Sequence, residues 1–192
     1  HIDRMKHSAD KLKIALGTVT AQIPDAVSEV VQANALRDAR VRITVTPPGT
    51  PDEDDPATLL VTAIPAAGYP PELYAKGMSV FLCTDFRQSA QDPLTGHKTT
   101  CYLPRLAALR TAHQRHCGES LWFTPQNLLA EGCVSNVFIV KNEKLLTPPL
   151  DTPVLPGITR ATILDLAAAH GIAAEEAILT VTDLLDGDEV FL

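Results

Sequence analysis

The sequence is short of positive charge. Of its 192 residues, 16 are lysine or arginine and 23 are aspartate or glutamate, which gives a formal net charge of -7 at pH 7. Binding to nucleic-acid phosphates or to an anionic membrane surface needs clustered lysine and arginine side chains. We therefore expect no nucleic acid and no membrane as partner, and a small molecule instead.

Long apolar runs and closely spaced cysteine pairs are also missing. The apolar runs break within about ten residues, well short of the roughly 20 that span a bilayer, and no basic-then-apolar leader opens the chain. The four cysteines lie far apart without a CxxC pair, which favours reduced thiols over a disulfide framework or a zinc ribbon; they are Cys83, Cys101, Cys117 and Cys133. We expect a cytoplasmic protein with no structural metal site.

The chain alternates between helical and strand patterns. A helical pattern opens it, and a second helix is expected from Asp25 as N-cap. Two strands, "VRITVT" and "TLLVTAI", flank the acidic, proline-rich stretch 47–57, which we interpret as a solvated hairpin loop. The strand "MSVFLCT", a helix over about 103–116, further strands and a helix ended by Gly171 follow.

This order of elements predicts an α+β (mixed α/β) fold in two domains. The stretch "PAAGYPP", residues 65–71, is rich in proline and glycine and is the candidate linker. We expect a small α/β domain over 1–66, a linker over 67–75 and a larger β-rich domain over 76–192.

Four groups in the sequence could together bind one cofactor. Lys98 in "GHKTTCYLP" has no carboxylate in residues 99–104 to pair with it, and we place it at a core-facing junction where amine chemistry is possible. Glu131 in "AEGCVSN" ends an apolar run, and "LPGITR" sets a glycine and free N–H groups at a helix start, where anions bind. Arg4 can form a surface ion pair with Asp3 or a neighbour, which its local sequence favours, or add a bidentate phosphate contact. An amine, a carboxylate, an arginine and an anion site together suit pyridoxal 5′-phosphate.

A metal-binding module is an alternative of a different class. In "HQRHC", His113, His116 and Cys117 have helical spacing and could converge on one face. Histidines in a last helical turn are also common as partners of the helix dipole, and we favour that interpretation.

Five ordered blocks resemble the class IV (fold type IV) pyridoxal-phosphate aminotransferases, which include branched-chain and D-amino-acid aminotransferases and aminodeoxychorismate lyase. The blocks are "HIDRM…SADKLKI", "HKTTCYLP", "AEGCVSNVFIV", "LLTPPLDTPVLPGITRATILDLA" and "DGDEVFL". The resemblance implies pyridoxal 5′-phosphate as cofactor, an amino acid and a 2-oxo acid as substrates, and a homodimer. It also implies further segments before and after this stretch.

The resemblance also implies roles for individual residues. Lys98 would form the Schiff base and act as the catalytic amine, and Glu131 would pair with the pyridine nitrogen. The phosphate would be held by Arg4 and by the backbone N–H groups of Ile158 and Thr159. The remaining two contacts with the cofactor would come from Leu155, against the ring, and from Tyr102.

Two positions depart from the family pattern. Cys101 stands where many members have asparagine, and Tyr102 lies one residue closer to the lysine than the corresponding tyrosine of the branched-chain branch. The predicted activity is transfer of an amino group between an amino acid and a 2-oxo acid. The alternatives are a 4-amino-4-deoxychorismate lyase that releases pyruvate by the same chemistry, and a non-catalytic relative, which would have no reason to keep both Lys98 and Glu131.

Overall fold

The structure is a computed structural model that describes residues 1–47 and 57–192. It divides into two compact units, His1–Lys76 and Gly77–Leu192, and each is described by itself. Most of the stretch predicted as a loop, 47–57, lies outside the described residues. The predicted linker, 67–75, holds most of a short helix, α3 (Pro71–Lys76), and the predicted domain boundaries stay a prediction.

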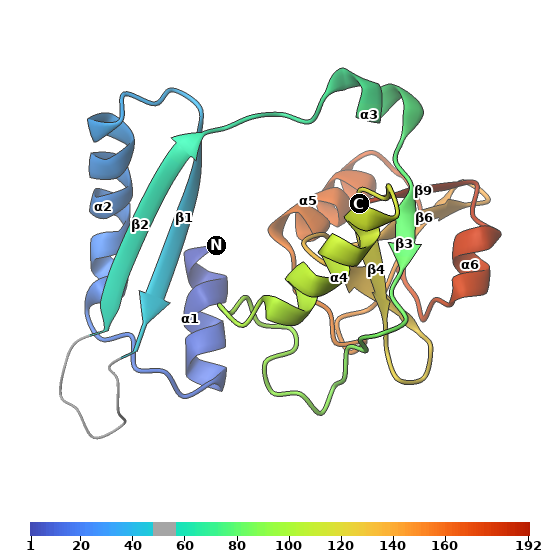
Figure 1. The fold of residues 1–192 in the computed structure, drawn as a ribbon, viewed down its shortest axis with the longest axis horizontal. Helices are drawn as coiled ribbons and strands as arrows, with labels where there is room; N and C mark the ends of the chain where they lie inside the picture. Colours follow the sequence, from blue (N-terminus) through green and yellow to red (C-terminus); the bar gives the residue numbers. More distant parts are fainter. Residues whose placement is uncertain (48–56) are drawn as a thin grey trace. The chain divides into compact units, whose positions relative to one another are not determined.

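The first unit has helix α2 packed on a two-stranded antiparallel sheet, with two further helices (Figure 1). Its elements are α1 (Ile2–Lys11), α2 (Val19–Ala33), β1 (Ala39–Thr46), β2 (Thr58–Pro65) and α3. The two strands pair antiparallel, with Ile43 opposite Val61, so that alternate apolar side chains share one face. Ile23 of α2 is buried at 1% exposure.

The predicted start of the second helix is wrong. The helix begins at Val19, so Pro24 lies inside it and Asp25 is an interior residue rather than the N-cap. Proline removes one hydrogen bond and strains the preceding turn, which makes it read as a helix boundary. Here Val19 and Ile23, one turn apart, are both buried, and this packing outweighs the local penalty.

The second unit contains two sheets. Its elements are β3 (Val80–Leu82), α4 (Leu103–Gln114), β4 (Glu119–Phe123), β5 (Leu129–Gly132), β6 (Phe138–Lys141), β7 (Lys144–Thr147), α5 (Ile158–Ala169), β8 (Ala174–Glu176), α6 (Val181–Leu185) and β9 (Glu189–Phe191). The strand orders are β3-β4-β5 and β8-β7-β6-β9, with β3/β4 and β7/β8 parallel and the other pairs antiparallel.

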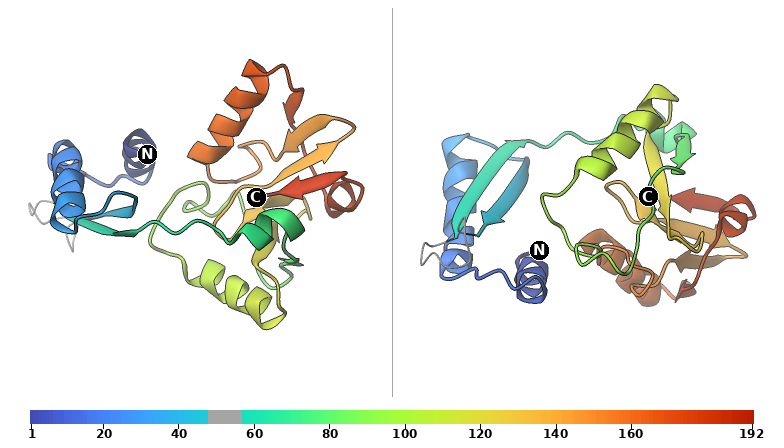
Figure 2. Two further views of the ribbon diagram at one scale, coloured as in Figure 1. Left: turned by 90° about the horizontal axis from the view of Figure 1, so that it is seen from above. Right: turned by 60° about the horizontal axis from the view of Figure 1, so that its bottom comes forward.

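One apolar cluster joins the two sheets. It contains Leu121 and Phe123 from β4, Leu129 from β5 and Ile139 from β6, all buried. Helices α4 and α5 lie on opposite sides of the strands (Figure 2), α4 against β4 and α5 through Ala167 against β6 and β7. All residues of β4 and of β5, which carries part of the site described below, are buried.

Candidate functional site

The loop before α4 presents Lys98 to solvent. Gly96 takes a φ of +80°, a left-handed conformation that glycine adopts without strain, just before the lysine. Lys98 is exposed, so the predicted core-facing position is wrong. Its Nζ donates a hydrogen bond of 2.9 Å to the hydroxyl of Tyr102 and lies 5.4 Å from the centre of that ring. The partner of the amine is thus a phenol.

Glu131, unlike Lys98, is almost fully buried. It is a β5 residue with only 2% exposure, and its carboxylate accepts four hydrogen bonds. Oε1 accepts from Arg105 Nη2 at 2.6 Å and from Gln88 Nε2 at 2.9 Å. Oε2 accepts from the backbone N–H of Leu155 at 2.9 Å and from Asn136 Nδ2 at 3.3 Å. A buried carboxylate needs such partners because burial removes its hydrogen bonds with water.

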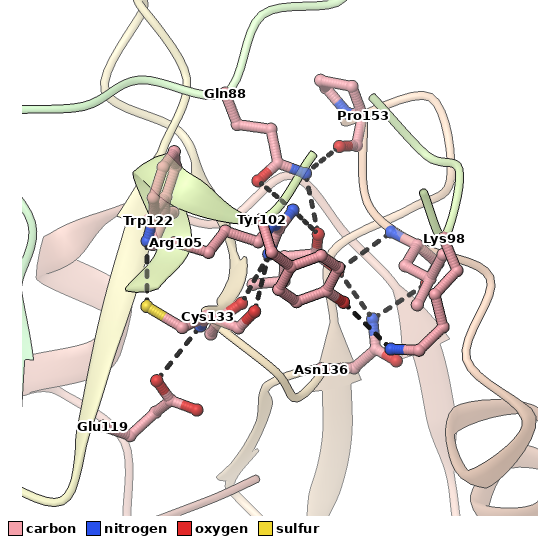
Figure 3. Close-up of polar contacts among 12 residues, drawn as sticks. Gln88, Lys98, Tyr102, Arg105, Glu119, Trp122, Cys133, Asn136 and Pro153 are labelled. Atoms are coloured by element: carbon pink, nitrogen blue, oxygen red, sulfur yellow. Dashed lines mark hydrogen bonds and ion pairs between the residues drawn. The ribbon is translucent and has the colours of Figure 1, made fainter. Parts of the chain in front are cut away.

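Arg105 supplies the cation of this group and is itself held from several sides (Figure 3). Its Nη1 donates to the backbone carbonyls of Gly132 at 3.0 Å and Cys133 at 3.1 Å. Its Nη2 also donates to Gln88 Oε1 at 3.2 Å, and its guanidinium carbon lies 5.4 Å from the centre of the Trp122 ring. The arginine therefore has a fixed position beside β5.

One pocket brings together four of the predicted residues, Lys98, Tyr102, Glu131 and Leu155. Its full lining is Gly96, His97, Lys98, Tyr102, Arg105, Glu131, Gly132, Cys133, Val134, Ser135, Asn136 and Leu155. An accessible amine and an ion-paired carboxylate thus share one cavity. This arrangement can bind a molecule that offers a group reactive with an amine and a basic or protonated nitrogen.

The helix start predicted as an anion site lies next to this pocket along the chain. Helix α5 begins at Ile158, with Gly157 as N-cap. The first N–H groups of a helix have no partner within it. Ile158 and Thr159 are exposed, and in the part of the chain that the structure describes they are not among the pocket lining. Their contact with a phosphate stays a prediction.

Asn136 links the helix start to the carboxylate. Its Nδ2 donates to the Leu155 carbonyl at 3.0 Å as well as to Glu131. A Cβ at Gly157 would lie 2.0 Å from Asn136 Oδ1, so a larger residue cannot fit there unless Asn136 moves. The glycine of "LPGITR" is therefore required by the close approach of a side chain.

Arg4 lies in the first unit, on α1, and is half-buried. Its predicted phosphate contact stays a prediction.

The turn after β5 rests on a second buried carboxylate, Glu119. Its Oε1 accepts from the N–H groups of Ser120 at 2.8 Å and Cys133 at 3.1 Å, and its Oε2 accepts from Ser135 Oγ at 3.2 Å. Burial raises the pKa of the Cys133 thiol to about 11, although the Trp122 N–H donates to its sulfur at 3.3 Å. Cys133 is therefore a neutral, unreactive thiol near pH 7.

The metal alternative receives no support from the geometry of its residues. Helix α4 ends at Gln114 and His116 has a φ of +59°, so His116 and Cys117 leave the helical face that His113 occupies. Within residues 1–47 and 57–192, no three His, Cys, Asp or Glu side chains gather as metal ligands would. In the same residues, no helix is long and apolar enough to cross a membrane.

Sequence reasoning missed Gln88, Arg105 and Asn136. Arg105 follows Tyr102 by three residues, a spacing that places two side chains on one helical face and could have marked it. Asn136 follows Glu131 by five residues across a turn, and Gln88 lies in an irregular segment after β3. Neither of these two positions has a periodic pattern that points to the site.

A family model described as amino-transferase class IV matches residues 1–192. The chain is 35% identical over 199 residues to the "Putative branched-chain-amino-acid aminotransferase" of Methanocaldococcus jannaschii, covering 100% of this chain and 67% of that protein. It is 29% identical over 196 residues to the D-alanine aminotransferase of Bacillus licheniformis, covering 100% and 68%. The chain thus spans about two thirds of the length of these curated relatives.

Solved structures give the same picture of the fold. The branched-chain amino acid aminotransferase of Escherichia coli superposes with a TM-score of 0.88 at 25% identity, covering 100% of this chain and 65% of that one. The "Putative 4-amino-4-deoxychorismate lyase" of Legionella pneumophila superposes with a TM-score of 0.88 at 23% identity, covering 100% and 71%. At 23% identity, the similarity to the Legionella pneumophila structure shows the fold alone.

Proposed function

The chain belongs to the class IV aminotransferase family, and from this premise we propose that its pocket binds pyridoxal 5′-phosphate, with Lys98 as the catalytic amine and Glu131 as the partner of the pyridine nitrogen. The family assignment confirms the predicted resemblance, the mixed α/β fold of fold type IV and the aminotransferase class of enzyme. Its aminotransferase relatives support the predicted transfer of an amino group.

The residues present fit this cofactor. A carboxylate with 2% exposure, ion-paired to Arg105, lines the same pocket as an exposed lysine amine. The start of α5, with Gly157 as N-cap, follows Leu155 of this pocket by a few residues, and its first N–H groups have no partner within the helix. Class IV aminotransferases depend on pyridoxal phosphate, and the Thermobaculum terrenum branched-chain aminotransferase, of similar fold, is described as being in its PLP-form.

In this proposal Lys98, Tyr102, Glu131 and Leu155 hold the ring, and Arg4 with the N–H groups of Ile158 and Thr159 holds the phosphate. When bound, the cofactor supplies an aldehyde that condenses with amines and a ring that withdraws electrons from the substrate.

The residues of the chain do the rest of the chemistry. Lys98 Nζ takes the proton from the α-carbon of the amino acid and returns one later, so it acts as general base and then as general acid. Tyr102 orients the amine through the hydrogen bond of 2.9 Å. Glu131 holds a proton on the ring nitrogen because its carboxylate accepts the N–H and carries the opposite charge.

The single observation that carries the proposal is the position of Glu131, buried and bonded to four donors in a pocket shared with Lys98. A surface glutamate that only caps a turn would not need this set of partners. Because Lys98 and the buried Glu131 line one pocket, this arrangement does not support the alternative of a non-catalytic relative.

The test is an assay of the full-length protein with 2-oxoglutarate and a panel of L- and D-amino acids, with glutamate as the product that is followed. Both stereochemical series are needed because the relatives act, by their names, on branched-chain amino acids or on D-alanine. Glutamate formed with any donor supports the proposal, and a Lys98→Ala variant that still forms it contradicts the role of the lysine.

The lyase alternative uses the same lysine and carboxylate. If the pocket admits 4-amino-4-deoxychorismate, proton abstraction by Lys98 leads to loss of pyruvate. A parallel assay with that substrate distinguishes the two activities. Pyruvate without amino-group exchange would overturn transamination in favour of the lyase, and neither product would overturn both.

A homodimer and a cytoplasmic location complete the proposal. The homodimer follows from the family resemblance, and the cytoplasmic location from the cysteine spacing that favours reduced thiols. Light scattering on the purified full-length protein and fractionation of the source cells would test them.

A further inference from the structure

Arg105 has a role that the motifs do not indicate. We propose that Arg105 is a positioning residue that fixes the carboxylate of Glu131 and supplies its counter-charge beside the cofactor ring; this inference rests on the proposed function. The guanidinium does not need to touch the cofactor for this role. It acts through the oxygen that it binds, Oε1 of Glu131, at 2.6 Å.

The first argument is that Arg105 is anchored independently of Glu131. Its Nη1 binds the carbonyls of Gly132 and Cys133, the two residues that follow the glutamate, and its guanidinium lies over the Trp122 ring. A planar fork held by two carbonyls cannot rotate without breaking both bonds. The position of Nη2, and with it that of Oε1, is therefore set by the backbone of the same strand.

The second argument concerns the two oxygens of the carboxylate. Oε1 is committed to Arg105 and to Gln88, which is itself buried at 3% exposure. Oε2 has one bond of ordinary length, to the Leu155 N–H, and one long bond of 3.3 Å, to Asn136. A carboxylate has about four acceptor positions. The least committed position thus belongs to Oε2, whose two donors both line the pocket.

The third argument concerns charge. The side chain of Glu131 is 3% exposed and that of Arg105 is 22% exposed, and among the described residues Arg105 is the one cation within ion-pair distance of this carboxylate. Removing the guanidinium would leave a buried carboxylate without its charge partner, and such a carboxylate is held less firmly in place.

Three substitutions separate this role from a structural one. Arg105→Gln keeps a hydrogen-bond donor but removes the charge, whereas Arg105→Lys keeps the charge but loses the fork. Arg110→Gln is the matched control, because Arg110 lies on the same helix and is exposed. All three are made in the full-length protein loaded with pyridoxal 5′-phosphate labelled with ¹⁵N in its ring.

The readout is the ¹⁵N chemical shift of the ring nitrogen, which reports whether that atom carries a proton. In the parent protein and in Arg110→Gln we expect the protonated shift. In Arg105→Gln we expect the shift to move toward the unprotonated value and kcat to fall about ten- to a hundredfold with little change in KM. Arg105→Lys should lie between the two. A purely structural role would lower stability without moving the ring signal.

The outcomes distinguish this inference from the proposed function. A parent protein that binds no cofactor would overturn the proposed function and this inference with it. A parent protein with a protonated ring, and an Arg105→Gln variant with the same shift and the same kcat, would overturn the inference alone. If Arg105→Gln does not fold, Arg105→Lys decides, because a parental shift and kcat in that variant would contradict the role of the fork.

Discussion

At one end of the pocket Glu131 projects from a strand, is buried and has four hydrogen-bond donors, whereas at the other end Lys98 projects from a loop, is exposed and has one, Tyr102. The difference matches the work proposed for each. A group that stabilises charge works best when it is preorganised. An amine that carries a proton between atoms needs freedom to move. Substitution of Lys98 should therefore affect chemistry alone, whereas substitution of Glu131 should affect both chemistry and stability.

The largest expected effect is at the exposed residue, Lys98. Lys98→Ala removes the amine that we propose binds the cofactor and moves the proton, so amino-group transfer should fall at least about a thousandfold. Because Lys98 is exposed, the free energy of unfolding should change by less than about 0.5 kcal/mol. Assays and denaturant unfolding of Lys98→Ala beside Lys76→Ala, an exposed lysine on α3, check both parts. Equal loss of activity in the two variants would break the comparison.

The second effect is at Glu131, where substitution should lower both turnover and the free energy of unfolding. Glu131→Gln replaces an ionised acceptor of four bonds by an amide that also carries an NH₂ group, so turnover should fall about ten- to a hundredfold. It also leaves Arg105 without its counter-ion, which should lower the free energy of unfolding by about 3 kcal/mol. The control is Glu143→Gln, an exposed residue in the turn between β6 and β7. Near-normal turnover in Glu131→Gln would show that this glutamate is structural.

The third effect concerns Asn136, which donates to Glu131 and lies against Gly157 at the start of α5. Gly157→Ala sets a Cβ 2.0 Å from Asn136 Oδ1, although the φ of -66° suits any residue. Asn136 must then move, and we expect a loss of about 1–3 kcal/mol in the free energy of unfolding, together with weaker cofactor binding.

Gly68→Ala is the matched control for that substitution, since a Cβ at Gly68 meets nothing within 4 Å. Its unfolding free energy should be unchanged or raised by up to about 1 kcal/mol. Equal cofactor affinity in the two variants would show that Asn136 and the helix start are independent of the site.

The sequence and the structure agree where a pattern is local. The alternation of "VRITVT" predicts β1, and Gly171, predicted to end a helix, has the expected φ of +68°. The early start of α2 could not be predicted from the sequence. The burial of Val19 and Ile23 outweighs the local tendency of Pro24 to mark a helix boundary. Gln88, Arg105 and Asn136 come from three separate segments and meet only when the second unit folds. Lys98 and Glu131 were predicted from their motifs, but the donors around Glu131 were not.

The smallest expected effect is a pH dependence from the turn beside Glu131. The pKa of Cys133 is raised from 9.0 to about 11 by burial, so the folded state keeps the proton that the unfolded state loses. The stability contributed by the neutral thiol is complete below pH 9 and is lost as the pH rises toward 11, by up to about 2 kcal/mol. Unfolding measurements from pH 8 to 11 should show a shallower fall for Cys133→Ala than for Cys101→Ala, whose thiol is exposed. Equal slopes would contradict the assignment.

The central claim is that Lys98 forms the covalent bond with pyridoxal 5′-phosphate. It is tested most directly by reducing the full-length protein with borohydride, which fixes the bond between cofactor and amine, and by mapping the labelled peptide with mass spectrometry. The account predicts one labelled peptide, with the phosphopyridoxyl group on Lys98, and none in Lys98→Ala. A label on another lysine, or no label on any peptide, would contradict it.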